Sequence, residues 1–559
     1  MSSFPGKDNS DRDCAKMKME LNVNGCPEIF QGHVVDIIRR RIFDGCIEVT
    51  DGRISSIHEC QEHLHDAPYI LPGFIDSHVH IESSMMTPSQ FAYVAAGHGT
   101  IGVVSDPHEI ANVLGVRGID FMLENASESN FNFCFGAPSC VPSCSSDIES
   151  GGAVLSSRDV EELLHRPRIG YLSEVMNFPG VLSEDPEVLA KIDSAIRAGK
   201  KVDGHAPGLL GVNRNRYARA GISTDHECTT YQEGLSCLDS EMNVLIRQGS
   251  AAKNYKVLIP LLALRPEKIM FCTDDCHPGD LLSGHINEIV KSALRDGYDL
   301  WDILRAACLN PQVHYNLNWG LLREGDPATF IIVDSLSPEM RVLGTFIRGE
   351  RPGICVPQKS GHYPNIFEAR EMGREDIFRT YEGLVPVIVA SDGELFTSSE
   401  YARRDDPSYP WDEVQKIVVV NRYRKGIPPS VGYIRGFNIK DGAMAASVAH
   451  DCHNIVAIGS SDSQILRVVN EVISMRGGLA ALSGKNRLSR LELPIAGIMS
   501  PLEGREVARL NREVLDTIAD AGCTMCSPFI TMSFMCLPVI PKVKITDKGV
   551  FDIEKWDFV

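Results

Sequence analysis

The segment from Leu71 to Glu82 constrains what this chain can fold into more than any other. It reads Leu-Pro-Gly-Phe-Ile-Asp-Ser-His-Val-His-Ile-Glu, and its apolar residues between 75 and 81 predict a buried strand. Residues two apart on a strand point to the same side, so His78 and His80 are expected to face one cavity. Two imidazoles on one face can bind a single metal ion, although two histidines can also fall together in a buried strand by chance.

Beyond this segment, short apolar strands alternate with helix-length segments as far as about residue 320. This alternation predicts a parallel α/β sheet. Polar residues at the strand ends favour a (β/α)8 barrel, because barrel active sites lie at the carboxyl ends of the strands. A doubly wound sheet is the alternative, and it would gather ligands near one switch point. The predicted strands are 102–106, 132–137, 170–174, 201–205, 221–226 and 268–275, and the clearest helices are 186–198, with Asp185 as N-cap, and 285–295.

The predicted barrel, residues 71–320, is flanked by regions of different character. Residues 19–70 contain β-like runs with a hairpin signal at Asp51-Gly52, and residues 321–355 contain two more such runs. We expect these two flanks to join in one small β domain. Residues 356–559 are expected to form a separate C-terminal α/β domain with helices near 462–475 and 506–521, and residues 1–18 a disordered tail.

Charge and cysteine content narrow the classes of function. The formal net charge of −19 disfavours binding to nucleic acid or to an anionic membrane. The chain has no apolar run of the roughly 20 residues that a membrane helix needs, and no apolar export signal is expected at its start. Its 17 cysteines follow no repeating spacing and are expected to be reduced thiols. These features predict a cytoplasmic protein that acts on a small molecule.

The polar residues at the predicted strand ends form a set with metal-binding chemistry. Imidazoles combined with carboxylates suit Zn, Mn or Fe. Such a set can fill one metal site, and a bridging Glu174 would allow a second. A metal lowers the pKa of bound water, and Asp274 could take the proton from that water and pass it to a leaving group. The set comprises His78, His80, Glu174, His205, His226 and Asp274, with Asp275 beside it.

Several longer motifs carry a resemblance to a known family. They include residues 72–85, Asp106-Pro-His-Glu within 104–113, Ser173-Glu-Val-Met-Asn, Asp203-Gly-His-Ala-Pro-Gly, Thr224-Asp-His-Glu, Cys272-Thr-Asp-Asp-Cys-His-Pro-Gly and Ala449-His-Asp-Cys-His-Asn. On these motifs, residues 30–559 resemble the adenine deaminase family of the metal-dependent amidohydrolase superfamily. The resemblance implies hydrolysis of adenine to hypoxanthine and ammonia in purine salvage. It also implies a binuclear Mn or Fe centre and a homo-oligomer, a dimer or larger.

The resemblance also implies roles for individual residues. Asp106 and His108 would shuttle protons or hold the purine, although both could instead stabilise a tight proline turn. Glu82, Glu227 and Asp275 are further candidates for substrate contact. His450 and His453 would close over the pocket from the C-terminal domain, or hydrogen-bond within its own loops. The implied metal ligands are His78, His80, His205, His226 and Asp274, with Glu174 as a bridging carboxylate where many superfamily members have a carboxylated lysine.

One departure from the superfamily leaves the proton shuttle open. Related deaminases use His-x-x-Glu after the fifth strand, but here Ala-Pro-Gly follows His205. The shuttle would then be Glu174, Asp274 or His108. A cyclic amidase of the dihydropyrimidinase type is an alternative that Glu174 disfavours, because those enzymes usually have lysine there. A deaminase of N6-substituted adenines is a closer alternative. An inactive scaffold is a remote one, since every expected ligand is present.

Overall fold

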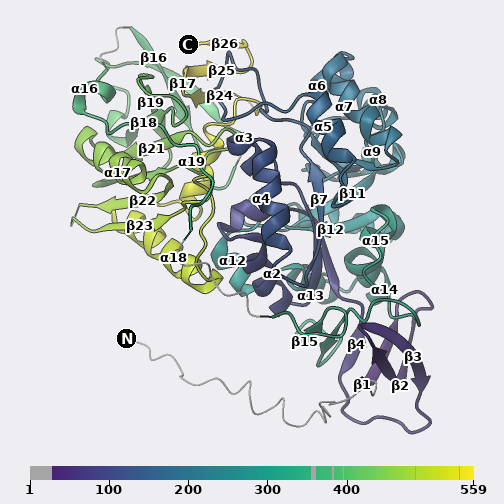
Figure 1. The fold of residues 1–559 in the computed structure, drawn as a ribbon. Coiled ribbons are helices and arrows are strands. Elements are labelled where there is room, and N and C mark those ends of the chain that lie inside the picture. Colours follow the sequence, from purple (N-terminus) through teal and green to yellow (C-terminus); the bar gives the residue numbers. More distant parts are fainter. Residues whose placement is uncertain (1–27, 354–360, 380–382, 395, 485, 541) are drawn as a thin grey trace.

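The computed structural model describes residues 28–559 except 354–360, 380–382, 395, 485 and 541. The expected tail, residues 1–18, and residues 19–27 of the expected β domain lie outside the described residues. Three parts are visible in Figure 1: a small sheet at the lower right, a central barrel with its helices, and a C-terminal part on the left.

The small sheet joins strands from both flanks of the barrel. Its strand order is β15-β14-β4-β1-β2-β3. Strands β2 and β3 form the expected hairpin: Thr50 pairs with Arg53, and both turn residues, Asp51 and Gly52, have positive φ angles of 49° and 72°. The strands are β1 (Glu28–Asp36), β2 (Arg41–Thr50), β3 (Arg53–Glu59), β4 (Tyr69–Leu71), β14 (Phe330–Val333) and β15 (Val342–Phe346).

The barrel consists of two parallel sheets that meet at both edges. Their strand orders are β13-β5-β6-β7-β8-β9 and β10-β11-β12. At one junction the Thr224 hydroxyl donates to Asp203 at 2.9 Å, and at the other the Thr273 amide donates to Asp76 at 3.1 Å. The closed arrangement confirms the barrel over the doubly wound sheet. The strands are β5 (Phe74–His80), β6 (Thr100–Ser105), β7 (Asn132–Ala137), β8 (Ile169–Val175), β9 (Lys201–Gly204), β10 (Thr224–Asp225), β11 (Asn243–Arg247), β12 (Ile269–Cys272) and β13 (Asp274–Asp275).

Helices between the strands cover the outside of the barrel (Figure 1). Helix α7 begins as expected, because the Asp185 side chain accepts hydrogen bonds from the amides of Glu187 and Val188. The helices are α2 (Pro88–Gly97), α3 (His108–Leu114), α4 (Val116–Ala126), α5 (Ser157–Leu164), α6 (Phe178–Leu182), α7 (Pro186–Arg197), α8 (Gly211–Arg219), α9 (Tyr231–Asp239), α10 (Tyr255–Leu258), α11 (Pro260–Leu264), α12 (Pro278–Ser283), α13 (Ile286–Arg295), α14 (Leu300–Leu304) and α15 (Asn310–His314).

The C-terminal part is built on a second large sheet with strand order β17-β16-β19-β18-β21-β20-β22-β23. Its helices α17 (Asp462–Met475) and α18 (Gly504–Asp520) lie where the sequence predicts them, and α16 (Arg374–Ile377) and α19 (Pro528–Phe534) are shorter. The strands are β16 (Leu384–Val389), β17 (Ser398–Arg403), β18 (Val414–Val420), β19 (Ser430–Arg435), β20 (Gly442–Ala446), β21 (Ile455–Gly459), β22 (Gly478–Ser483) and β23 (Leu488–Glu492), followed by β24 (Val543–Thr546), β25 (Gly549–Asp552) and β26 (Asp557–Phe558).

The C-terminal part packs on the end of the barrel where the strands finish. The Asn454 side chain donates to the Ser150 carbonyl at 2.9 Å, and the Thr546 hydroxyl donates to the Ile148 carbonyl at 2.7 Å. In Figure 1 helix α3 of the barrel accordingly lies beside α19. No helix in the described part of the chain combines the length and the apolar character that crossing a bilayer requires.

Candidate active site

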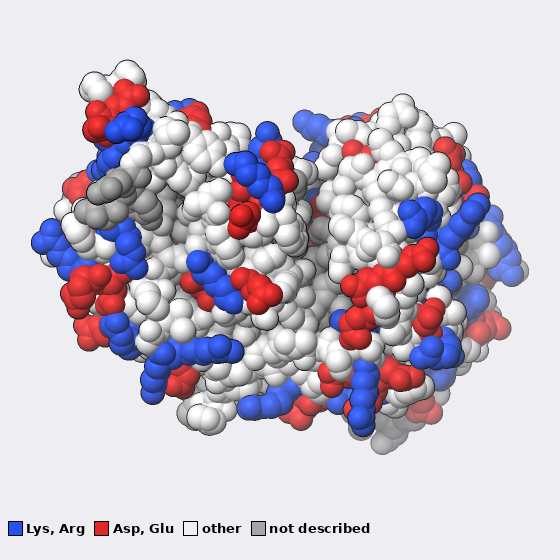
Figure 2. All heavy atoms as spheres, turned by 90° about the horizontal axis from the view of Figure 1, so that it is seen from above, with Lys and Arg blue, Asp and Glu red and all other residues white. Residues whose placement is uncertain are grey.

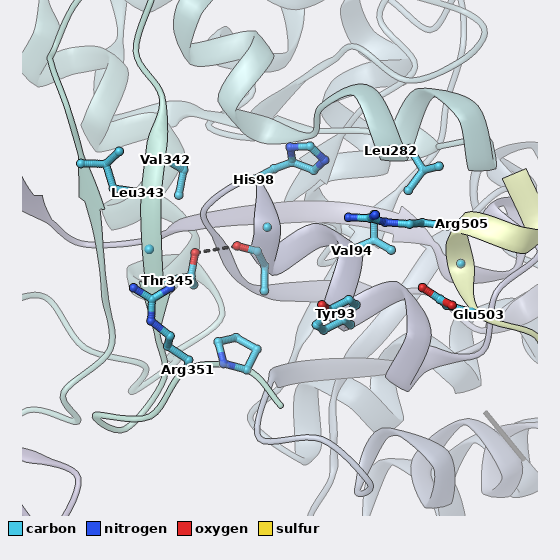
Figure 3. Close-up of a pocket in the computed structure, with 15 residues that line it drawn as sticks. Tyr93, Val94, His98, Leu282, Val342, Leu343, Thr345, Arg351, Glu503 and Arg505 are labelled. Carbon is cyan, nitrogen blue, oxygen red and sulfur yellow. Dashed lines mark hydrogen bonds between the residues drawn. The ribbon is translucent and has the colours of Figure 1, made fainter. Parts of the chain in front are cut away.

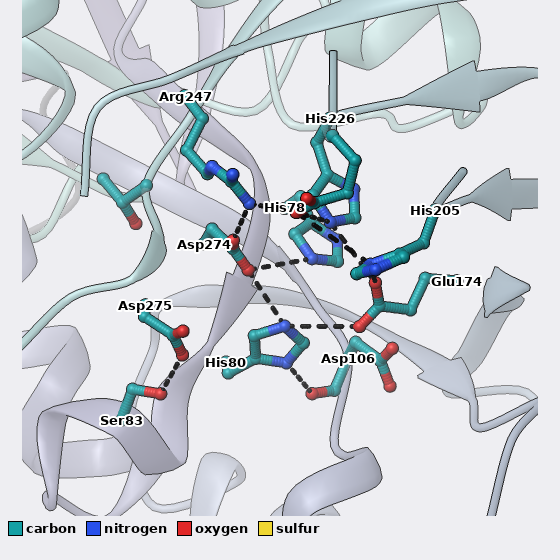
Figure 4. A network of polar contacts seen from close by, with 12 residues as sticks. His78, His80, Ser83, Asp106, Glu174, His205, His226, Arg247, Asp274 and Asp275 are labelled. Carbon is teal, nitrogen blue, oxygen red and sulfur yellow. Dashed lines mark hydrogen bonds and ion pairs between the residues drawn. The ribbon is translucent and has the colours of Figure 1, made fainter. Parts of the chain in front are cut away.

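The six predicted metal ligands converge at the carboxyl ends of the barrel strands (Figure 4). We call them the floor cluster: His78, His80, Glu174, His205, His226 and Asp274. Two lie on β5, one on β8 and one on β13, and the other two immediately follow β9 and β10. The barrel brings them together because parallel strands end at the same rim.

Glu174 stands at the centre of the floor cluster. One carboxylate oxygen lies 2.6 Å from Nδ1 of His205 and 3.3 Å from Nε2 of His226, and the other lies 3.4 Å from Nε2 of His80. Burial opposes ionisation of this carboxyl, but His205 and His226 outweigh it and hold the pKa of Glu174 well below its usual range. A carboxylate with histidines on both sides is placed as a bridging ligand would be.

The donor set fits a divalent metal. The His78 ring is fully buried and stacks on His226 with centroids 4.0 Å apart; its Nε2 lies 3.4 Å from Oδ1 of Asp274, and its Nδ1 has no hydrogen-bond partner among the described residues. A buried polar group without a partner is costly unless something else satisfies it. The ligand atoms of His78, His80 and Asp274 lie within 4.8 Å of one another, and so do those of His78, Glu174 and His226.

Arg247 balances the negative charge at the edge of the floor cluster. Its guanidinium contacts Glu227 and lies 2.5 Å from Oδ2 of Asp274, while Oδ1 of Asp274 lies 3.0 Å from Nε2 of His80. Burial opposes ionisation of Asp274, but Arg247 and the two histidines of β5 hold its pKa well below its usual range. Asp274 has a φ of 59°, a left-handed conformation that a non-glycine residue keeps only where its surroundings hold it.

Asp106 and His108 form a polar chain that leads away from Glu174. Nδ1 of His108 lies 3.4 Å from Glu174 and 3.2 Å from Oδ2 of Asp106. The other Asp106 oxygen accepts hydrogen bonds from the His108 amide at 3.1 Å and from the Ser173 hydroxyl at 2.7 Å. Asp106 therefore both shapes the turn and orients the imidazole, so the two alternatives for this motif are compatible.

A small cavity of about 50 Å³ opens above the floor cluster. The C-terminal part contributes His450, Asp451, Phe534 and Leu537 to its lining, beside Asp275 and Met176 of the barrel. A second cavity of about 520 Å³ shares Glu227, Arg247, Ala251 and Ala252 with it and is also lined by Asp392, Glu394 and Cys526 of the C-terminal part. Figure 2 shows the surface hollowed between the C-terminal part on the left and the barrel helices on the right.

A larger cavity lies elsewhere. It has a volume of about 780 Å³ and is lined by Tyr93, His98, Thr345 and Arg351 among others (Figure 3). The Thr345 hydroxyl donates to the Ala96 carbonyl at 2.5 Å on its wall. None of the predicted site residues lines it.

The predicted substrate contacts divide into two groups. Asp275 and His450 line the small cavity, whereas Glu82 and His453 are not among its lining residues. One Glu82 oxygen accepts from the Ile110 amide at 3.2 Å while the other has no hydrogen-bond partner among the described residues, and burial raises the pKa of this carboxyl to about 7. His453 forms an ion pair with Glu109 behind the cavity wall.

Sequence reasoning gave no role to Arg247, Glu109, Asp451 or Phe534. Arg247 ends β11, which was not among the predicted strands, although Asn243-Val-Leu-Ile-Arg has the same pattern of an apolar run with a polar end. Glu109 and Asp451 stand inside motifs that were recognised, each beside a histidine. Phe534 ends a run, residues 528–534, that resembles the family, but nothing in this run pointed to the cavity, because its position depends on how the C-terminal part docks.

Comparison with known proteins places the chain in a family. Residues 69–351 match the amidohydrolase family and residues 397–557 match the adenine deaminase C-terminal domain. An adenine deaminase of Sulfurovum sp. is 46% identical over 95% of this chain and 98% of its own length. One from Methanosarcina barkeri is 44% identical over 95% of this chain and 99% of its own length.

Among solved structures, the N-acetyl-D-glucosamine-6-phosphate deacetylase of Mycobacterium smegmatis is 15% identical, with a TM-score of 0.45 over 58% of this chain and 99% of that chain. The identity and coverage of the curated relatives, together with both domain matches, decide the assignment. The chain belongs to the adenine deaminase family of the metal-dependent amidohydrolases.

Proposed function

We propose that this protein hydrolyses adenine to hypoxanthine and ammonia in purine salvage. The observation that carries the proposal is the convergence of four imidazoles and two carboxylates below a small cavity roofed by the C-terminal part. The relatives that are named adenine deaminases support the same substrate.

We propose that the floor cluster holds a binuclear centre of Mn or Fe, although Zn also suits its donors. Glu174 would bridge, His78, His80 and Asp274 would complete one position, and His205 and His226 the other. A bound divalent metal would lower the pKa of water and so supply hydroxide at neutral pH.

The reaction requires both protons of water to move within the site. The oxygen of water bonds to C6 of the purine and one of its protons goes to a ring nitrogen; the bond from C6 to the amino nitrogen then breaks, and the other proton leaves with that nitrogen as ammonia. We assign the transfer to Glu174 and Asp274, with His108, which lines the cavity, as the relay and Asp106 as the partner of its ring. Nδ1 of His108 lies 3.4 Å from Glu174 and 3.2 Å from Asp106, which supports this assignment. Arg247 helps to keep Asp274 ionised, the form in which it can bind a metal and accept a proton.

The purine would lie between the floor cluster and the residues above it. Asp275 and His450 line that space and are proposed to contact the base directly. Asp275 is held by the Ser83 hydroxyl. Glu82 and His453 do not line this space and would support it indirectly. Glu82 accepts a hydrogen bond from the Ile110 amide, and His453 contacts Glu109.

Location and assembly complete the proposal. We propose a cytoplasmic homo-oligomer, a dimer or larger, that binds neither nucleic acid nor membrane. The net charge of −19 supports the absence of polyanionic partners. The 17 cysteines follow no repeating spacing, which supports a reducing compartment.

The test is ammonia release from adenine by protein purified with manganese, with adenosine and cytosine as controls. The variants Glu174→Gln and Asp274→Asn are measured beside the wild type. Turnover of adenine alone, lost in both variants, is the expected result. A metal-loaded protein that is inactive on adenine would refute the substrate while leaving the metal site intact.

An N6-substituted adenine is a second candidate substrate. The cavity of about 520 Å³ shares four lining residues with the small one and offers room for a substituent. Comparing kcat/KM for N6-methyladenine with that for adenine decides between them, and a clear preference for the substituted base would replace adenine as the substrate.

A further inference from the structure

A second polar cluster lies above the small cavity and joins the two halves of the molecule. Glu109, on the first turn of α3 and 1% exposed, faces two histidines of the C-terminal part. Its Oε1 lies 2.5 Å from Nδ1 of His450, and its Oε2 forms an ion pair with Nε2 of His453. We call Glu109, His450, His453 and Phe534 the roof cluster. Oε1 of Glu109 also lies 3.6 Å from Nε2 of His108, and the chemistry proposed above uses Glu109 only as the partner of His453.

The hydrogen bonding of His453 determines how Glu109 is used. Nδ1 of His453 accepts the Ala449 amide at 3.2 Å, so the ring proton must be on Nε2, the nitrogen that faces Glu109. His453 therefore anchors one oxygen of the carboxylate. The other oxygen faces Nδ1 of His450 and favours a proton on that nitrogen.

With Nδ1 of His450 turned to Glu109, its Nε2 is directed to the cavity side. Nε2 lies 4.0 Å from Oδ2 of Asp275, which lines the same cavity. The ring of Phe534 stacks on His450, with centroids 5.5 Å apart and planes at 25°, so the imidazole is held in orientation as well as in position. Both rings line the cavity opposite the floor cluster.

We propose that Glu109 is a positioning residue: anchored by His453, it holds His450 so that Nε2 donates a hydrogen bond to a ring nitrogen of the purine. This inference rests on the proposed function and names how that site recognises a heteroaromatic base. The unprotonated ring nitrogens of a purine are acceptors in the plane of the base, and a fixed imidazole N–H can select such an acceptor.

The charges around His450 support a protonated, donating ring. Burial lowers its pKa, but Glu109 and Asp275 raise it, and the balance is a pKa of about 9. The groups that face it are Glu109 of α3, Asp275 of β13, Asp451 beside it, and the imidazoles of His277 and His453. The carboxylates outweigh the imidazoles.

The competing explanation is that the roof cluster only fastens the C-terminal part to the barrel. A matched control separates the two. The Thr546 hydroxyl also bonds across this boundary, to the Ile148 carbonyl at 2.7 Å, and Thr546 is fully buried and does not line the cavity. Thr546→Val removes this cross-boundary bond at nearly constant volume.

The first experiment compares KM, kcat and the thermal midpoint in manganese-loaded protein. The variants are Glu109→Gln, His450→Phe, His450→Gln, the double variant Glu109→Gln/His450→Phe, and Thr546→Val. A hydrogen bond from a charged donor predicts that Glu109→Gln and His450→Phe raise KM for adenine by about 10- to 100-fold, with a smaller change in kcat. His450→Gln, which keeps a donor near Nε2, should recover part of the loss.

The double variant tests most directly whether Glu109 acts through His450. If Glu109 acts through His450, the double variant is no worse than His450→Phe alone, because the two residues are coupled. Thr546→Val is expected to lower the thermal midpoint and leave KM unchanged. The inference is overturned if Glu109→Gln leaves KM within about twofold of the wild type, if the two effects multiply, or if Thr546→Val raises KM equally.

Deaza analogues identify the acceptor and keep the inference separate from the proposed reaction. Binding of 1-, 3- and 7-deazaadenine to manganese-loaded wild type and to His450→Phe is measured by calorimetry, with adenine as reference. One analogue should bind the wild type weakly and lose nothing further in His450→Phe. Equal losses for all three overturn the inference. If adenine binds but is not hydrolysed, only the reaction is refuted; if adenine does not bind, both fail.

Discussion

The floor and roof clusters face each other across one small cavity but are built in different ways. The floor cluster comes from strand ends of a single barrel, whose parallel pairing positions every member. The roof cluster is assembled from α3 of the barrel, the loop before β21 and helix α19. The proposed reaction chemistry therefore lies at the barrel rim, and the proposed recognition of the base lies at a boundary between two parts of the chain.

The two clusters also differ in how they neutralise buried charge. In the floor cluster Arg247 offsets Glu227 and Asp274, and the remaining donors converge as metal ligands do. In the roof cluster the charge of Glu109 is offset mainly by His450, while a neutral His453 holds the other oxygen, and no arginine among the described residues pairs with this carboxylate. Removing a floor residue should abolish turnover, whereas removing a roof residue should change KM.

The largest effect is expected for Glu174→Gln. The substitution removes the carboxylate that faces three histidines and begins the relay to His108. Loss of a proton-transfer group alone costs about 10²- to 10⁴-fold, and loss of a bridging ligand adds to it. Ammonia release and bound metal are measured together. More than a tenth of wild-type activity at full metal content would show that Glu174 is not central to the floor cluster.

Arg247→Met tests the charge balance of the floor cluster. Breaking a buried ion pair by removing one partner costs about 3–5 kcal/mol, because Glu227 and Asp274 are left uncompensated. We expect the thermal midpoint to fall by several degrees and kcat to fall by about 10- to 100-fold. Arg247→Lys, which keeps the charge, should recover part of both. Equal stability of Arg247→Met and the wild type would mean that the pair contributes little.

The contrast between the clusters also explains what the sequence could reveal. Alternating strands and helices predicted the barrel, and the position of His78, Glu174 and Asp274 at strand ends predicted that they would share one rim. Such a prediction works because strand direction and side-chain alternation are local properties of the chain. Strand β11 was missed although it follows the same pattern, and Arg247 was missed with it.

The roof cluster could not be derived in the same way. The docking of two surfaces decides which residues of the C-terminal part contact Glu109. Docking produces no periodic pattern in the sequence. His450 and His453 were noted only through the resemblance of their motif, and their division into a cavity residue and an anchor depends on the three-dimensional arrangement. Phe534, on a seven-residue helix, could have been any buried apolar residue.

Phe534→Leu tests the roof cluster by replacing its aromatic ring with an aliphatic side chain. The Phe534 ring stacks on His450, and an aromatic pair contributes about 0.5–1.5 kcal/mol beyond its buried area, so KM for adenine should rise by about 2- to 10-fold while kcat changes little. The thermal midpoint serves as the control, because leucine keeps the position apolar. A fall in kcat with constant KM would place Phe534 with the chemistry of the floor cluster instead.

The smallest effect is expected at Glu82, which links the two clusters because it follows β5 and accepts the Ile110 amide of α3. Burial raises its pKa from 4.5 to about 7. Its contribution to stability is therefore fully present below pH 4.5 and is lost as the pH rises through about 7. Glu82→Gln keeps an acceptor for the Ile110 amide and cannot ionise. The thermal midpoint of this variant relative to wild type should thus increase between about pH 5 and pH 8.

Glu162→Gln, whose parent side chain is 65% exposed, provides the control for loss of a surface carboxylate. A difference between Glu82→Gln and wild type that stays constant with pH would show that Glu82 is already ionised in the folded protein, and that the link between floor and roof carries a buried charge.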